Sequence, residues 1–199
     1  VAAIAQSNIK RMLAYSSIAH AGYILIAVAA SANSPDGVSA ALFYMFAYLF
    51  SNLGAFAIVI AMEKNDDQGT ALDDYKGLWK RSPAMALAMA VFMLSLAGIP
   101  PTAGFVGKLY VFRAAVEANL IWLAVVGVIT AVISAFYYLR VVYLMFMYEG
   151  EAQIEAKPAL RTAVVIMVLA VLLIGVLPGT WFTLAQEAGL RGMQLLAGG

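Results

Sequence analysis

The chain has 199 residues, of which 64% are hydrophobic and only 12% are charged, and its mean hydropathy is +0.89. An average soluble domain is about 45–50% apolar and about 25% charged, so the composition excludes an ordinary soluble domain and a disordered chain. The net charge of +1 also gives no attraction for a polyanion, which excludes a nucleic-acid-binding protein. The composition therefore predicts a polytopic membrane protein.

Five segments are long and apolar enough to cross a bilayer, which takes about 20 helical residues for about 30 Å. They run from about residue 12 to 30, 38 to 62, 84 to 116, 120 to 148 and 160 to 177. Strands are not expected, because open sheet edges cannot exist in lipid. Residues 1–199 are thus predicted to form one all-α bundle of five transmembrane helices.

Two segments lie outside these crossings. Residues 63–83 form a charged loop, in which residues 72–79 are predicted to make a short amphipathic turn on the membrane. Residues 179–199 are too few and too polar to cross, so this tail is predicted to lie at the membrane interface. The chain begins at Val1 without a signal-peptide pattern, which favours a fragment or a processed chain.

Basic residues are distributed unevenly between the two sides of the membrane. The side of Val1 carries Lys10, Arg11, Lys64, Lys76, Lys80, Arg81, Lys157 and Arg161, whereas the other side carries only Arg113 and Arg191. Cytoplasmic loops carry an excess of Lys and Arg. The start of the chain is therefore predicted to be cytoplasmic and its end, after an odd number of crossings, to lie outside.

The third crossing contains an interruption and a lysine. Gly98, Pro100 and Pro101 are expected to break the helix as a hinge, since proline removes backbone donors. Lys108 follows roughly 10 Å beyond that break, at about 1.5 Å per residue. A lysine at such depth costs at least ~2.5–3.5 kcal/mol and usually faces a bundle interior. We predict that Lys108 carries protons; the alternatives are a snorkelling lysine and a simple proline kink.

His20 is the one histidine of the chain, and Ser16 and Tyr23 share its helix face. Its pKa in water lies near physiological pH, so it is a second candidate for a proton relay. Hydrogen-bonded packing is the alternative, and a Ser–His hydrolase is disfavoured because no carboxylate lies in the first three crossings. The presence of Lys10 is explained by the excess of basic residues on the cytoplasmic side. The other interpretation is that Lys10 is a proton-relay residue on that side.

Further polar residues lie along the predicted helices and would suit a hydrated path through the bundle. The candidates are Ser16, Tyr23, Tyr48, Ser51, Thr102, Ser134 and Arg140. Taken alone, each is better explained by hydrogen bonds that hold helices together, and Arg140 by snorkelling or an ion pair. The chain has no cysteine, so disulfides, iron–sulfur ligation and thiol catalysis are excluded. We expect no catalytic residue and no metal site.

Two stretches resemble a known family. Residues 8–23 read NIKRMLAYSSIAHAGY and residues 95–108 read SLAGIPPTAGFVGK; both are similar to signatures of the antiporter-like membrane subunits of respiratory complex I. Residues 48–56 and 137–141 resemble one of these subunits more than the others, and more than Mrp-type sodium/proton antiporters. The resemblance implies a fourteen-helix subunit, of which this chain holds the tenth to fourteenth helices.

The resemblance also implies a function. The chain would belong to the proton-translocating membrane arm of NADH:quinone oxidoreductase, with Lys108 near the outward half-channel and with His20 and Lys10 at recurrent polar positions. It would bind no cofactor, because NADH, FMN, iron–sulfur clusters and quinone belong to other subunits. Its partners would be neighbouring membrane subunits, lipid and protons, in a bacterial plasma membrane.

The family's earlier glutamate–lysine pair and central lysine would lie before Val1, so this chain alone is expected not to conduct protons. Two alternatives stay open. One is a subunit of an Mrp-type cation/proton antiporter, which shares both signatures. The other is a purely structural membrane subunit, against which a lysine buried beside a helix break is the main argument.

Overall fold

The computed structural model describes residues 2–63 and 69–197, so Lys64 and small parts of the predicted loop and tail lie outside the described residues. Within these residues, four helices are long and apolar enough to cross a membrane. They are α1 (Ile9–Ala30), α2 (Gly37–Met62), α6 (Ile121–Met147) and α7 (Pro158–Val176). Their bounds agree with four of the five predicted segments to within a few residues.

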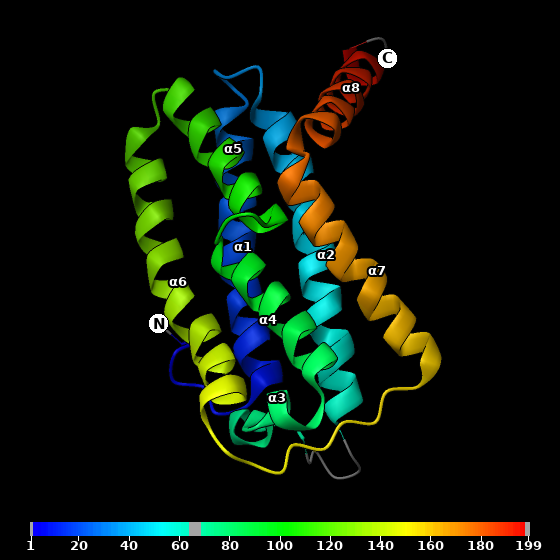
Figure 1. Cartoon of the computed structure of the whole chain (residues 1–199). Helices are drawn as coiled ribbons and strands as arrows, with labels where there is room; N and C mark the ends of the chain where they lie inside the picture. The colour runs from blue at the N-terminus through cyan, green and yellow to red at the C-terminus, as the bar shows by residue number, and fades with distance from the viewer. Residues whose placement is uncertain (1, 64–68, 198–199) are drawn as a thin grey trace.

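The remaining crossing consists of two shorter helices in series. Helix α4 (Pro83–Ala97) fills the lower half of the bundle and α5 (Ala103–Glu117) continues upward from it (Figure 1). Each has 15 residues, too few to cross a bilayer alone at about 1.5 Å per residue. The prediction of a five-crossing helical bundle with its third helix broken is therefore confirmed.

Helix α2 lies at the centre of the bundle and packs against α1, α4, α5, α7 and α8 (Pro178–Ala197). Small residues permit this close packing: a Cβ on Gly54 would lie 2.2 Å from the ring of Phe92, and one on Gly107 would lie 2.7 Å from the ring of Tyr44. The outer faces of α6 and α7 instead expose large apolar side chains such as Val132 and Leu169. These outer faces suit contact with lipid.

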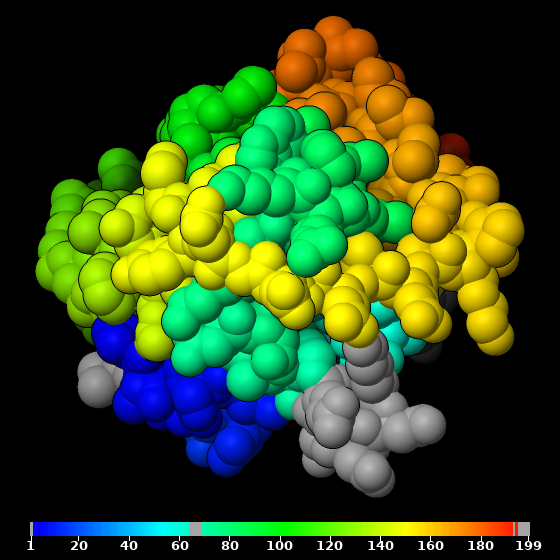
Figure 2. Space-filling model, turned by 60° about the horizontal axis from the view of Figure 1, so that its bottom comes forward, coloured from blue at the N-terminus to red at the C-terminus, as the bar shows by residue number. Residues whose placement is uncertain are grey.

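The end of the bundle where α1 begins is closed by short helices. The 3-10 helix η2 (Leu72–Tyr75) and α3 (Leu78–Arg81) bury one apolar side, and burial raises the pKa of Tyr75. Residues 148–157 run across them (Figure 2). There the Lys80 ammonium lies 2.5 Å from a Glu149 oxygen, and this hydrogen bond lowers the pKa of the Glu149 carboxyl. The amphipathic turn predicted at residues 72–79 is thus a pair of short helices.

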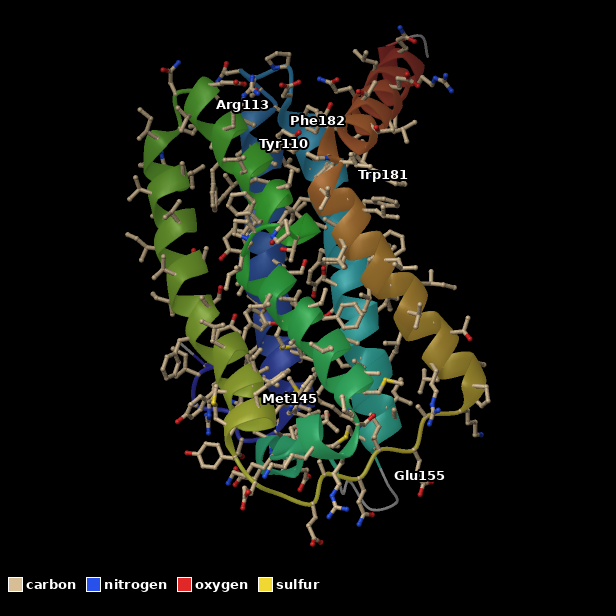
Figure 3. The ribbon with its side chains drawn as sticks, in the orientation of Figure 1. Tyr110, Arg113, Met145, Glu155, Trp181 and Phe182 are labelled. Atoms are coloured by element: carbon tan, nitrogen blue, oxygen red, sulfur yellow. The ribbon has the colours of Figure 1, made fainter. Side chains whose placement is uncertain are left out.

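Helix α8 (Pro178–Ala197) occupies the segment that we expected only as an interfacial tail. Phe182 stacks on Tyr110 of α5, with ring centroids 4.0 Å apart, where both are seen at the upper end of the bundle (Figure 3). The Gln186 side chain donates to Asp36 at 3.0 Å. These contacts fix the first turns of α8 against α2 and α5, and its place at the membrane interface stays a prediction.

Candidate functional site: the helix break and the buried polar cluster

Gly98 ends α4 in the left-handed conformation, with φ 86° and ψ 47°. This conformation is open to glycine and costs other residues about 1–2 kcal/mol. The Gly98 amide donates to Leu94 and Ser95, and the Ile99 amide donates to Leu94 at 2.9 Å. Such a glycine-terminated end satisfies part of the carbonyl groups that the last helical turn leaves free. The following Pro100–Pro101 peptide bond is cis, and no helix resumes before Ala103.

Lys108 satisfies the next carbonyl groups of α4 from across the break. Its ammonium Nζ donates to the carbonyl oxygens of Leu96 and Ala97, both at 2.9 Å. It also lies 5.2 Å from the ring centroid of Tyr23, within the range of a cation–π contact. The side chain is buried, with only 5% of the residue exposed, and no described carboxylate lies within ion-pair distance. A helix carboxyl end, which is partly negative, therefore takes the place of a counter-ion.

Ser95 makes a second connection across the break. Its hydroxyl lies 2.7 Å from the Ser51 hydroxyl of α2 and accepts from the Gly104 amide of α5 at 3.1 Å. Since Ser51 donates to Ala47 at 3.0 Å, Ser95 is the donor in the Ser51 bond. A Cβ on Gly104 would lie 1.9 Å from the Ser95 carbonyl oxygen, so only glycine permits this approach. Three helices are joined at one point.

The linker between α4 and α5 is held by its own hydrogen bond and by α7. Thr102 is buried, and its hydroxyl donates to the Ile99 carbonyl at 2.7 Å. On the other side, a Cβ on Gly175 of α7 would lie 2.3 Å from the Pro101 carbonyl oxygen. The linker is therefore packed against α7 on one side and anchored by the buried Thr102, while Pro100 and Pro101 themselves are exposed.

His20 joins three helices through its imidazole ring. Its Nδ1 lies 2.6 Å from the Tyr44 hydroxyl of α2, and its Nε2 lies 2.8 Å from the Tyr138 hydroxyl of α6. The ring of Tyr48 stacks on it, with centroids 4.4 Å apart. A neutral imidazole donates from one nitrogen and accepts at the other, so the two tyrosines fit opposite roles. His20 is thus both a packing residue and a group with two possible proton partners.

Tyr23 lies between the His20 cluster and the helix break. Its ring meets those of His20 and Tyr44 edge to face, each at 5.8 Å, and it also lies 5.2 Å from the Lys108 ammonium. Its hydroxyl is buried without a hydrogen bond of normal geometry in the described residues, although Ser134 of α6 lies nearby. The Tyr23 ring thus lies against both His20 and Lys108, and no hydrogen bond among the described residues connects those two.

The remaining candidates are placed differently. Ser16 and Ser134 are buried beside this cluster, but their hydroxyls donate to Leu13 and Ala131 of their own helices. Lys10 pairs with Glu63 at the end of the bundle where α1 begins and α2 ends. Lys10 is ten residues before His20, about 15 Å along α1.

Arg140 is not part of the central cluster. Its side chain is exposed on the outer face of α6. The structure therefore brings Lys108, Tyr23, His20 and Tyr48 together, places Ser51 and Thr102 at the break, and leaves Arg140 outside.

Three polar partners in this region were not among the candidates that the sequence suggested. Tyr138 is the main omission, because it bonds His20 directly. The spacing of four residues between Ser134 and Tyr138 was the available signal, since such pairs share a helix face. Tyr44 and Ser95 are polar residues of predicted crossings, but nothing in the sequence shows that they meet His20 and Ser51.

Comparison with known families gives a match that covers more than half of the chain. Residues 1–134 match the family described as "NADH:quinone oxidoreductase/Mrp antiporter, TM". This range includes α1 to α5, the helix break, and most of the polar cluster. It ends at Ser134, four residues before Tyr138.

Similar proteins include NADH-quinone oxidoreductase subunit N 1 of Herpetosiphon aurantiacus, which is 52% identical over 94% of this chain and 38% of its own length. A chain of respiratory complex I from Thermus thermophilus with bound aureothin is 36% identical and has a TM-score of 0.78, covering 92% of this chain and 41% of that one.

A chain of the Mrp complex from Dietzia sp. DQ12-45-1b is 22% identical and has a TM-score of 0.83, covering 94% of this chain and 43% of that one. At that identity the Mrp likeness shows the fold alone. The curated relatives confirm the resemblance to antiporter-like subunits. The chain spans about two-fifths of the length of these relatives.

Proposed function

This chain belongs to the NADH:quinone oxidoreductase/Mrp antiporter transmembrane family, and from that premise we propose that it forms part of a subunit N in the proton-translocating membrane arm of a NADH-quinone oxidoreductase. In this proposal Lys108 takes up and releases the proton. Quinone reduction by other subunits, which hold NADH, FMN, iron–sulfur clusters and quinone, drives the movement through a charge change on a neighbouring lysine outside this chain.

The surroundings of the Lys108 amine carry the proposal. A lysine ammonium has three N–H donors, of which two are directed to Leu96 and Ala97 and the Tyr23 ring is the third neighbour. A neutral amine keeps two N–H groups and gains a lone pair. It can therefore retain both carbonyl bonds and present the lone pair where the third proton had been. Both protonation states can therefore keep the two carbonyl bonds, and only the ammonium gains the cation–π contact with Tyr23.

The polar residues around His20 would exchange protons with Lys108 on its cytoplasmic side. The imidazole of His20 can accept a proton at one nitrogen and release one at the other, with Tyr44 and Tyr138 in hydrogen-bonding contact. Tyr23 is the remaining group between His20 and Lys108. We propose that protons reach Lys108 from this side and leave along α5.

The proposed orientation follows from charge. The basic residues gather at the end of the bundle where α1 begins, which by the positive-inside rule faces the cytoplasm. The end of α5, with Arg113, would then face outward across a bacterial plasma membrane. Neighbouring membrane subunits and lipid would surround the bundle.

The test replaces Lys108 in the complete complex. Lys108→Gln retains a donor for the α4 carbonyl groups but cannot carry a proton, so it should assemble and oxidise NADH while the number of protons pumped per NADH falls. Lys157→Gln, at the exposed start of α7, is the matched control and should pump normally.

Native gel electrophoresis, together with NADH oxidation by a soluble electron acceptor, verifies assembly. Pumping per NADH that is unchanged in an assembled Lys108→Gln complex would contradict the proposal. Sodium-dependent proton transport without NADH would instead indicate an antiporter of the Mrp type.

A further inference from the structure

Arg140 is a basic residue at membrane depth without a partner among the described residues. It lies seven residues before the end of α6 at Met147, about 10 Å along the helix. Its side chain is exposed, and none of the ion pairs or hydrogen bonds of the described residues includes it. A cation at that depth requires an anion or a path to the headgroups. The structure therefore leaves a charge that something outside the chain must balance.

Arg140 lines a groove of about 590 Å³ on the outside of the bundle. The groove lies where the lower end of α6, at the outer edge in Figure 1, packs against η2 and α3. Phe136 and Leu139 form an apolar wall toward the membrane centre, and Tyr143 and Tyr148 lie toward the headgroup side. Tyrosine is enriched at that level of a bilayer. The groove is thus graded from apolar to polar along the membrane normal.

The charged side chains that line the groove sum to a net charge of +1. Lys76 also contributes to it, but its ammonium lies 2.9 Å from the Asp73 carboxylate. It is also 5.3 Å from the ring centroid of Tyr148. The Lys76–Asp73 pair is neutral, so Arg140 gives the groove a net charge of +1. One phosphodiester carries the opposite charge, and a guanidinium binds phosphate oxygens through two parallel hydrogen bonds.

We propose that this groove binds one anionic phospholipid of the leaflet on the side where α1 begins. Arg140 reaches along α6 to the headgroup phosphate, the Lys76 ammonium forms the outer edge of the phosphate site, and an acyl chain lies along Phe136 and Leu139. The assignment is independent of proton transport, because none of these side chains contacts Lys108 or His20.

A second groove at the opposite end of the bundle provides a contrast. It lies between α5 and α6, has a volume of about 630 Å³, and includes Arg113 and Glu117 in a largely apolar lining. There the Arg113 guanidinium already lies 2.7 Å from the Glu117 carboxylate, so the basic residue is neutralised within the chain. An apolar groove with no net charge has no preference for an anionic lipid. The charge left on Arg140 is what distinguishes the two.

The experiment uses the complete complex and a phosphatidylglycerol whose acyl chain carries a photoreactive diazirine. After irradiation in nanodiscs, mass spectrometry should find labelled peptides from residues 132–148. Arg140→Gln should reduce this labelling about fivefold, since one cation near anionic lipid is worth about 1 kcal/mol. Arg140→Lys should retain part of it. Arg113→Gln is the matched control and should leave it unchanged.

Three outcomes would overturn the proposal. Equal labelling by a phosphatidylcholine probe would show that no anionic headgroup is selected. Labelling that Arg140→Gln leaves unchanged would remove the phosphate role of the guanidinium. Failure of any lipid probe to label residues 132–148 in the assembled complex would show that a neighbouring subunit covers the groove and balances Arg140 with its own carboxylate.

Discussion

Lys108 and Arg140 are both basic residues well inside a membrane crossing, but their surroundings are opposite. Lys108 belongs to the broken crossing of α4 and α5, where its ammonium is buried and bonded to two carbonyl oxygens. Arg140 belongs to α6, an unbroken helix of 27 residues, where its side chain is exposed and unpaired within the described residues.

The helix break explains this difference. In the interior of a helix every carbonyl oxygen is bonded to an amide four residues later, and only the last turn has free carbonyl groups. The carboxyl end of α4 brings such groups into the bundle, where they bind a cation without any carboxylate. The unbroken helix α6 has no such free carbonyl groups beside Arg140, whose side chain lies on its outer face. A broken helix therefore stabilises a buried lysine that has no carboxylate partner.

The largest expected effect comes from changing the residue that ends α4. In Gly98→Ala, alanine must adopt the left-handed conformation of Gly98, which costs about 1–2 kcal/mol. The new Cβ would lie 2.9 Å from Cδ and 3.1 Å from Nζ of Lys108. The lysine would then lose its carbonyl bonds, each worth about 1.5–3 kcal/mol for a charged donor. We expect a lower temperature of thermal inactivation of the complex and strongly reduced pumping per NADH.

Gly22→Ala is the control for Gly98→Ala. A Cβ at Gly22 meets nothing within 4 Å, and alanine inside a helix is favoured over glycine by about 0.5–1 kcal/mol. The control complex should be as stable as the parent or slightly more so. If Gly98→Ala behaves in the same way, the left-handed helix end does not position Lys108.

An intermediate effect is expected at His20, which lies on an unbroken helix and is satisfied by side chains of other helices. Tyr44→Phe or Tyr138→Phe leaves one buried imidazole nitrogen without a partner, at a cost of about 1–3 kcal/mol. Tyr48→Phe should change stability little, because the Tyr48 hydroxyl is buried without a partner in the described residues. Thermal inactivation of the three variants measures this order, and an equal loss in all three would contradict it.

The smallest effect is expected where a cation lies near water. Lys10 and Glu63 form a half-exposed ion pair, with side-chain exposures of 35% and 32%, and such pairs contribute about 0–1 kcal/mol. Lys10→Gln should shift thermal inactivation slightly, and the shift should shrink at high salt because exposed pairs are screened. A large and salt-independent loss of pumping would instead make Lys10 a member of the proton path.

The helical crossings could be predicted closely because each depends on local composition. The positions of α1, α2, α6 and α7, and the break at Gly98, follow from apolar length and from residues that cannot continue a helix. Helix α8 was expected only as a tail, since its polar residues lower its hydropathy. Its position against α2 and α5 is set by contacts such as those of Phe182 and Gln186, which composition does not reveal.

The partners of the polar residues could not be predicted in the same way. Spacing correctly placed Ser16, His20 and Tyr23 on one face of α1, because a single helix fixes which side chains share a face. It did not indicate that Tyr138 meets His20, or that Arg140, two residues later on the same helix, points outward.

The sequence by itself thus determined a membrane bundle, its five crossings and a lysine placed just beyond a helix break. Only the tertiary structure decided that this lysine bonds the carbonyl end of α4 while Arg140 remains unpaired. The reason is physical: apolar length and helix-ending residues act within one segment. A buried polar group, in contrast, is satisfied by whatever neighbouring helices bring to the same depth.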